Sequence, residues 1–280
     1  MKTRLVAAVL LILMGAYTNP VIAQESKPAI VLVHGAWADG SSWAKVIPLL
    51  EKAGLNAVAV QNPLTSLADD VAATKRAIAR LDGPVILVGH SYGGAVISEG
   101  GNDPKVVGLV YVAAFAPDVG EAVGELGKEF PPAPGGAELR PDAGGFLTVT
   151  TKGVLENFAQ DLPLAERKLL AATQGPTNGA AFGAKLTNAA WKTKRTWYVV
   201  AANDRMIPPD LERKFAKAII YENQTAVGES EFGNTNRLRS EVKSDQARRS
   251  LHCVKGLNRN SKMPKQNFYS EIQPDGMRCR

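Results

Sequence analysis

Five short apolar runs predict the β-strands of this chain. Each is rich in Val, Ile, Leu or Ala without regular polar alternation, a pattern typical of strands buried on both faces of a sheet. The runs cover residues 29–33, 56–60, 85–88, 106–112 and 196–201.

The stretches between these runs predict helices. Ser42 is placed to cap a helix over 43–53, and Ser66 forms a capping box with Asp69 at the start of another. The second helix has apolar residues at helical spacing on one face. They are Leu67, Val71, Ile78 and Leu81, with Thr74 between them, and further helices are expected over 93–100 and 209–219. Strands that alternate with helices predict an α/β fold with a doubly wound, mostly parallel sheet.

The alternation stops between residues 116 and 191. This insertion contains a Pro- and Gly-rich loop over 130–145, and its other segments resemble short helices. Because it stands between two strands of the predicted sheet, it predicts a small helical cap over the strand ends. The helices are expected over 154–160, 164–174 and 180–191, within a main domain over 24–220.

A nucleophile-elbow pattern follows the third strand. The sequence Gly-His-Ser-Tyr-Gly places Ser91 midway between Gly89 and Gly93, directly after the apolar run. The serine of such a turn has a strained backbone, so the residues two places before and after it must be small. The following helix presents its positive N-terminal end to the hydroxyl. The pattern predicts Ser91 as a nucleophile.

A serine nucleophile also needs a base and backbone donors for the oxyanion. The predicted donors are the amide of Tyr92, next to the nucleophile, and that of Ala36, in the loop after the first strand. We interpret His34 as a residue that orients this loop. We interpret His90 as structural, because its side chain leaves the elbow on the side away from Ser91.

Asp204 follows the fifth strand at a distance from the next helix. Acidic residues after strands often cap a helix, but Asp210 suits that role better. His34, Ser91 and Asp204 all fall just beyond strand ends, where a parallel sheet places its ligand site. We therefore predict Asp204 as the carboxylate that orients the catalytic histidine.

Residues 28 to about 219 resemble the α/β-hydrolase superfamily. Within it they are similar to exported bacterial esterase-like members related to plant methylesterases and hydroxynitrile lyases. The segments that carry the resemblance are 31–37, 89–94, 110–115 and 197–209. The resemblance implies Ser91 as nucleophile, Asp204 as triad acid, and Ala36 and Tyr92 as oxyanion amides. The lyases have a threonine where this chain has Gly35, so cyanohydrin cleavage is disfavoured.

The chain departs from the family pattern after residue 219. The resemblance implies one more strand there and then a loop with the catalytic histidine, but residues 224–234 contain no histidine. From Tyr221 onward only 9 of 60 residues are Leu, Ile, Val or Phe, a composition typical of poorly ordered chains. We expect the C-terminal strand and helix to be missing or replaced, residues 221–280 to form an atypical tail, and the last strand to be an exposed edge.

Two explanations of the tail remain open. In one, the chain leaves its ancestral reading frame near Ile220 and has no catalytic base. In the other, His252, one of three histidines in the chain, reaches Ser91 from a rearranged tail and acts as the base. Cys253 and Cys279 lie in the same tail, where they either form a disulfide or are incidental thiols.

Residues 1–23 predict a secretory signal peptide. Lys2 and Arg4 precede an apolar stretch over 5–14, and small Ala23 precedes the expected cleavage point. The alternative, a retained membrane anchor, is disfavoured because the apolar stretch is short for a bilayer span. After cleavage of the signal peptide we expect no stable membrane span. We expect a periplasmic or secreted protein.

The net charge of +6 comes from the two ends of the chain. Residues 1–23 carry two positive charges and residues 221–280 a net four, so the body between them is neutral. This distribution gives no support for nucleic-acid binding. The sequence shows no metal-ligand cluster and no phosphate-binding glycine loop, so no cofactor is expected.

The sequence as a whole predicts a serine-dependent hydrolase of a small carboxylic ester that works through an acyl-enzyme, impaired if no histidine serves as base. The alternative is a non-catalytic protein that binds a small ligand on a hydrolase scaffold. Neither the identity of the substrate nor the oligomeric state can be read from the sequence.

Overall fold

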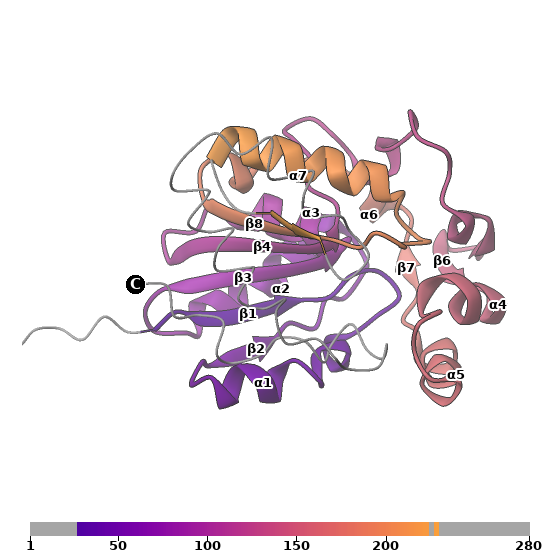
Figure 1. Cartoon of the computed structure of the whole chain (residues 1–280), viewed down its shortest axis with the longest axis horizontal. Coiled ribbons are helices and arrows are strands. Elements are labelled where there is room, and N and C mark those ends of the chain that lie inside the picture. Colours follow the sequence, from indigo (N-terminus) through magenta and orange to yellow (C-terminus); the bar gives the residue numbers. More distant parts are fainter. Residues whose placement is uncertain (1–26, 224–226, 230–280) are drawn as a thin grey trace, which may run out of the picture.

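The computed structural model describes residues 27–223 and 227–229. Their main feature is a six-stranded parallel sheet with the strand order β2-β1-β3-β4-β8-β9 (Figure 1). The prediction of a doubly wound, mostly parallel sheet is therefore confirmed. The strands are β1 (Ala29–Val33), β2 (Ala57–Ala59), β3 (Val85–Ser91), β4 (Val106–Ala114), β8 (Arg195–Val200) and β9 (Val227–Glu229).

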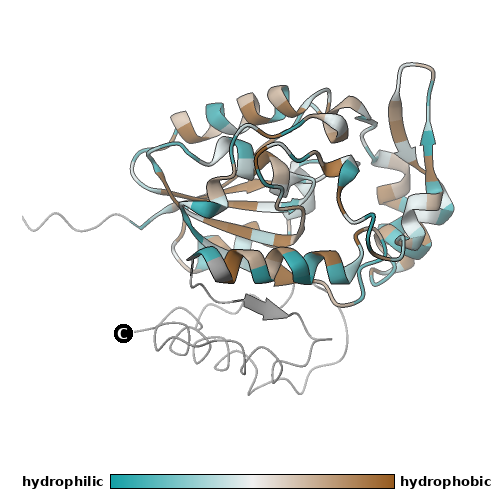
Figure 2. Ribbon diagram, turned by 90° about the horizontal axis from the view of Figure 1, so that it is seen from above, coloured by the Kyte–Doolittle hydropathy of each residue, from teal (hydrophilic) through white to brown (hydrophobic). Residues whose placement is uncertain are grey.

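Helices cover both faces of this sheet because its strands are apolar on both sides. Ile30 and Leu32 pack against Leu50 of helix α1 (Ile47–Lys52) on one face. Val31 and Leu87 belong to a larger core on the other face. That core includes residues of α2 (Leu67–Ala79), α3 (Gly93–Gly100) and α7 (Pro209–Asn223). In Figure 2 the central strands are largely brown, whereas the surrounding helices alternate between brown and teal.

The helix starts follow the capping residues only in part. The predicted cap of α2 is confirmed, because the Ser66 hydroxyl accepts the Asp69 N–H at 3.1 Å. The helix predicted over 43–53 was wrong in its start and its cap. Asp39, and not Ser42, caps a 3-10 turn η1 (Gly40–Trp43), and α1 begins only at Ile47, where a proline in the first turn favours a new start.

The edge of the sheet also differs from the prediction. We expected β8 to be an exposed edge, but β9 pairs with residues 198–200 in parallel. Strand pairing uses backbone N–H and C=O groups, so a segment of polar composition can still supply it. The remainder of the predicted tail, with His252, Cys253 and Cys279, lies outside the described residues.

The segment between β4 and β8 forms a cap beyond the carboxyl ends of the parallel strands (Figure 1). It was predicted to be helical but also contains a three-stranded antiparallel sheet, whose strands of two to four residues are too short to show a period in the sequence. Its strands are β5 (Leu139–Pro141), β6 (Phe146–Val149) and β7 (Thr177–Asn178). Its α-helices are α4 (Thr151–Gly153), α5 (Leu164–Thr173) and α6 (Ala180–Gly183), with a π-helical turn η4 (Val154–Phe158) and 3-10 turns η2 (Val123–Glu125), η3 (Pro134–Glu138) and η5 (Ala190–Lys192).

Among the described helices, none combines the length and the apolar character that crossing a bilayer requires.

Candidate active site

Ser91 is the last residue of β3 and stands directly before the cap residue of α3. Its φ of 53° lies in the left-handed region, which a non-glycine residue rarely adopts. The strand therefore turns into the helix at this residue, as the elbow pattern predicts, and leaves the side chain half-buried. A strained residue of this kind is often found at functional sites.

The glycines around Ser91 are required by close backbone contacts. A Cβ atom on Gly89 would lie 2.7 Å from the Gly93 carbonyl oxygen. A Cβ atom on Gly93 would lie 2.5 Å from the Val33 carbonyl oxygen. Both distances are shorter than real Cβ contacts, so only glycine allows β1, β3 and α3 to meet at this point.

The loop after β1 lies against the elbow. A Cβ atom on Gly35 would lie 2.7 Å from the Ser91 Cβ and 3.3 Å from its Oγ, so the loop passes directly against Ser91 at the residue before Ala36. Ala36 and Tyr92 are buried, and among the hydrogen bonds of the described residues neither backbone N–H is a donor. Buried N–H groups are nearly always paired. Two buried amides that have no acceptor in the described part of the chain, next to a serine, are the arrangement that an oxyanion requires.

The cap fixes the shape of this loop. Trp37 has a φ of 60°, and its backbone N–H donates to Thr177 Oγ1 of β7 at 3.1 Å. Its indole N–H donates to the Leu147 carbonyl oxygen of β6 at 2.9 Å. The small sheet that the sequence did not reveal thus determines where the residue next to Ala36 lies.

His34 is fully buried, and both of its ring nitrogens are in use. Nε2 accepts the Asn62 backbone N–H at 3.0 Å, so Nδ1 has the proton and donates it to the Gly35 carbonyl oxygen at 2.8 Å. Burial lowers the pKa of this imidazole. These contacts agree with the interpretation of His34 as a residue that orients the loop.

His90 packs against the opposite side of the sheet from Ser91. Its ring meets that of Trp43 edge-on at a centroid distance of 6.4 Å, and Trp43 belongs to the core around α1. Successive side chains of a strand point to opposite faces, so the imidazole cannot reach the serine hydroxyl. Burial lowers the pKa of His90 to about 4, so the ring is neutral at physiological pH.

Asp204 lies in the loop between β8 and α7. Its Oδ1 accepts the backbone N–H groups of Met206 at 2.6 Å and Ile207 at 2.7 Å. Burial raises its pKa despite these two hydrogen bonds, and the nearby charge of Asp161 adds to the effect. Among the described residues no hydrogen bond uses the second carboxylate oxygen, so this oxygen can accept from a further partner.

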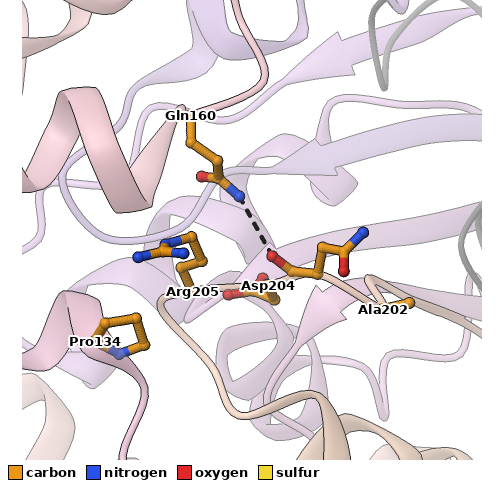
Figure 3. Close-up of a pocket in the computed structure, with 6 residues that line it drawn as sticks. Pro134, Gln160, Ala202, Asp204 and Arg205 are labelled. Atoms are coloured by element: carbon orange, nitrogen blue, oxygen red, sulfur yellow. Dashed lines mark hydrogen bonds between the residues drawn. The ribbon is translucent and has the colours of Figure 1, made fainter. Parts of the chain in front are cut away.

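A hollow of about 500 Å³ opens beside this carboxylate (Figure 3). Arg205 and Gln160 line it, and the Gln160 amide donates to the Asn203 carbonyl oxygen at 3.3 Å. Arg205 also connects the loop to the cap, because its Nε donates to Asn157 Oδ1 at 2.8 Å. The hollow has room for a side chain or a small ligand next to Asp204.

Ser91 and Asp204 lie at the same edge of the sheet but do not meet. Their strands, β3 and β8, are separated by β4, and neighbouring strands are about 4.8 Å apart, so the two strands lie roughly 10 Å from each other. An imidazole placed between them could bond to both. Neither His34 nor His90 occupies that position, and the third candidate, His252, lies outside the described residues.

Asp70 is a buried residue near this site that sequence reasoning did not single out. It is fully buried in α2, and its Oδ2 accepts the Tyr92 hydroxyl at 2.9 Å. The helical period contained a signal, since Asp70 falls on the apolar face between Leu67 and Thr74. Within the described part of the chain, no group of three His, Cys, Asp or Glu side chains could bind a metal ion.

Comparison with known proteins places the chain in a family. Residues 30–229 match the alpha/beta hydrolase family. The chain is 26% identical over 211 residues to the alpha/beta hydrolase nvfD of Aspergillus novofumigatus, covering 68% of this chain and 84% of the relative. It is 27% identical over 216 residues to the alpha-hydroxynitrile lyase of Arabidopsis thaliana, with the same coverage of 68% and 84%.

Solved structures agree with this assignment. Polyneuridine aldehyde esterase superposes with a TM-score of 0.64 at 19% identity, over 78% of this chain and 97% of that one. The resemblance in fold therefore extends through the sheet and the cap. The elbow, the loop that faces it and the acid after β8 all stand on this fold, and the chain belongs to the α/β-hydrolase family.

Proposed function

We propose that the protein hydrolyses small carboxylic esters with Ser91 as the nucleophile, through an acyl-enzyme. One observation carries the proposal. The strained Ser91 lies beside two buried amides, those of Ala36 and Tyr92, that have no acceptor among the described residues. A plain structural turn has no need for such a pair, whereas ester hydrolysis requires it at the point where negative charge develops.

The geometry supports the following sequence of steps. Ser91 Oγ attacks the ester carbonyl carbon while its proton passes to a base, and the carbonyl oxygen becomes an oxyanion that accepts the two N–H groups. The tetrahedral species collapses as the base returns its proton to the ester oxygen, the neutral alcohol leaves, and the acyl group remains on Oγ. Water then attacks the acyl-enzyme in the same way and releases the acid.

The proton from Ser91 needs an acceptor, and neither described histidine is free to serve as this base. His34 could act as base only by giving up its hydrogen bond to Asn62 or to Gly35, and His90 faces the other side of the sheet. We propose His252 as the base, with Asp204 as the carboxylate that orients it. If the chain has no base, the oxyanion donors and substrate binding alone still give about 10³- to 10⁴-fold acceleration over water.

The glycine at position 35 favours ester hydrolysis over cyanohydrin cleavage for this chain. Esterases are among the structural neighbours, and a hydroxynitrile lyase is among the sequence relatives. The lyases of this group have a threonine at the position of Gly35. Here a Cβ atom would lie 2.7 Å from the Ser91 Cβ and 2.9 Å from the His90 carbonyl oxygen, so no side chain fits without displacing the elbow.

A second candidate function is binding of a small ligand without turnover. It is favoured by the engagement of both described histidines in structural contacts. In that case the hollow beside Asp204 would bind a ligand where the family has its histidine.

A fluorophosphonate probe tests the proposal. We expect Ser91 to be phosphonylated and the Ser91→Ala variant to be inert. A panel of short-chain esters should show turnover that the same substitution abolishes and that His252→Ala reduces. Ligand-induced thermal stabilisation without labelling would favour the binding protein and overturn the hydrolase.

A further inference from the structure

Asp70 is a buried carboxylate for which the proposed reaction has no direct use. It is fully buried, and no basic side chain among the described residues pairs with it. Burying an unpaired carboxylate is costly unless hydrogen bonds compensate. Burial indeed raises the pKa of Asp70, and the hydrogen bonds from Leu64 and Tyr92 oppose this shift. The position of these two donors indicates what the carboxylate does.

The first donor belongs to the nucleophile elbow. The Tyr92 hydroxyl donates to Asp70 Oδ2 at 2.9 Å, and the Tyr92 ring is fully buried against Phe182 at a centroid distance of 5.4 Å. The backbone amide of the same residue is the proposed oxyanion donor next to Ser91. Asp70 therefore fixes the side chain of the residue whose N–H must point at the oxyanion.

The second group that donates to Asp70, the Leu64 N–H, connects it to Ala36, the other proposed oxyanion donor. We call the contacts from Asp70 to Tyr92 the elbow arm and those from Asp70 to Ala36 the loop arm. Asp70 Oδ1 accepts the Leu64 N–H at 2.8 Å, and this contact supports a φ of 59° at Leu64. The Leu64 carbonyl oxygen accepts the Asn178 N–H of β7 at 2.8 Å. The preceding residue, Thr177, accepts the Trp37 N–H at 3.1 Å. Trp37 directly follows Ala36, the second proposed donor.

We propose that Asp70 is a positioning residue that aligns both oxyanion donors, that of Tyr92 directly and that of Ala36 through Leu64 and β7. The inference rests on the proposed function for its catalytic consequence but on the hydrogen bonds alone for its structural part. A carboxylate suits this role because it accepts from two donors at once and donates to neither. Carboxylate acceptors also form shorter and stronger hydrogen bonds than neutral ones.

Two substitutions separate the two arms. Asp70→Asn is isosteric, but it has an oxygen at only one of the two positions where the carboxylate accepts, so either the Leu64 N–H or the Tyr92 hydroxyl faces an NH₂ group instead of an acceptor. Tyr92→Phe keeps the ring and removes only the hydroxyl that reaches Asp70. Asp69→Asn is the matched control, because Asp69 is the exposed neighbour that bonds to Ser66 and Thr65 and lies outside the site.

Two measurements on the full chain test the proposal. The first is the kcat and KM of ester hydrolysis, together with the rate of Ser91 phosphonylation by the probe. The second is hydrogen exchange, followed by mass spectrometry, over residues 34–38 and 89–95. We expect Asp70→Asn to increase exchange in both segments, Tyr92→Phe to increase it only in 89–95, and Asp69→Asn to change neither.

The kinetic expectation follows from the cost of losing an oxyanion donor, about 100- to 1000-fold in rate. Because a displaced donor costs less than a missing one, we expect about a tenfold to hundredfold loss of kcat in both variants, with KM little changed. The double variant should lose no more than Asp70→Asn alone, since the two residues share one interaction.

The outcomes separate failure of this inference from failure of the proposed function. Wild-type kcat in Asp70→Asn, or an exchange change confined to residues 64–70, would overturn the role of Asp70. If the wild-type chain is neither labelled nor active, the hydrolase proposal fails, yet the exchange pattern still confirms or refutes the link between the two arms. Should Asp70→Asn fail to fold, Tyr92→Phe still tests the elbow arm by both measurements.

Discussion

Asp204 allows a prediction in which stability and activity change in different directions. Its Oδ1 accepts two backbone N–H groups, those of Met206 and Ile207. Its pKa is nevertheless raised, because burial of the charge outweighs these bonds. The ionised form of the carboxylate is therefore less stable in the folded protein than in the unfolded chain. Proteins retain an unfavourable buried charge of this kind where function requires it.

The magnitudes follow from replacing the side chain in two ways. Asp204→Asn keeps an oxygen at Oδ1 for both N–H groups and removes the buried charge. Each unit of raised pKa corresponds to about 1.4 kcal/mol, part of which is offset because a neutral oxygen is a weaker acceptor. We expect Asp204→Asn to be between neutral and about 1 kcal/mol more stable than wild type at pH 7. Asp204→Ala leaves both N–H groups unpaired and should cost about 2 kcal/mol or more.

The pH dependence has a definite sign. With a folded-state pKa raised above the unfolded value of 3.8, the folded chain binds more protons than the unfolded chain between those two values. The contribution of this group to stability is therefore fully present below pH 3.8 and is lost as the pH rises through the folded pKa. The advantage of Asp204→Asn over wild type should be largest at pH 7 and should shrink as the pH falls toward about 4.

The assay is urea unfolding followed by tryptophan fluorescence at pH 7 and pH 5, beside the rate of ester hydrolysis. Asp210→Asn is the matched control, because this exposed residue in the first turn of α7 pairs with Arg213 at 2.9 Å. It should change stability by no more than about 0.5 kcal/mol. Asp204→Asn should lose about 10⁴-fold in kcat if the residue orients the base. If Asp204→Asn is as unstable as Asp204→Ala at both pH values, the reasoning is refuted, because the cost of burying the charge would then not outweigh the hydrogen bonds that the charge makes.

Three further predictions concern the elbow. Ser91→Gly should be about 1 kcal/mol more stable than Ser91→Ala, because only glycine adopts the φ of 53° without strain; equal melting temperatures would argue against strain at this position. His90→Phe should keep probe labelling of Ser91 and lose less than about 1.5 kcal/mol of stability, because the ring only packs edge-on against Trp43; loss of labelling in a folded variant would make His90 a functional group. Gly35→Thr should abolish labelling without producing cyanohydrin cleavage, because its Cβ would displace Ser91; preserved labelling, measured on the same probe, would contradict the tight fit.

The sequence predicted those parts of the fold that have their own periodic pattern. The strands β1, β3 and β4 are continuous apolar runs, and the elbow has glycines at fixed spacing, so each is specified locally. The strands β5 to β7 were missed because two to four residues are too few to show an alternation. The strand β9 was missed because its three residues are likewise too few to show a pattern.

The site shows the same division. The positions of Ser91, at the end of β3, and of Asp204, beyond the end of β8, could be predicted because a parallel sheet collects polar groups at its carboxyl ends. The partners of Asp70 could not, because Tyr92 is 22 residues away in sequence and the path to Trp37 passes through β7. Such contacts exist only once the fold brings distant segments together.

The proposed nucleophile and the proposed base come from different parts of the chain: Ser91 belongs to the described residues, and His252 to the C-terminal segment. Within the part of the chain that the structure describes, the contacts cited for Ser91, the two amides and Asp204 come from the β1 loop, the elbow, the cap and the loop before α7. The chain that follows adds β9 beside β8, and it also supplies the proton acceptor if His252 is the base. We expect a chimera with the C-terminal strand and histidine loop of an active relative to hydrolyse esters faster, with no change in the labelling site. A chimera that folds but gains no rate would show that proton transfer is not what limits this protein.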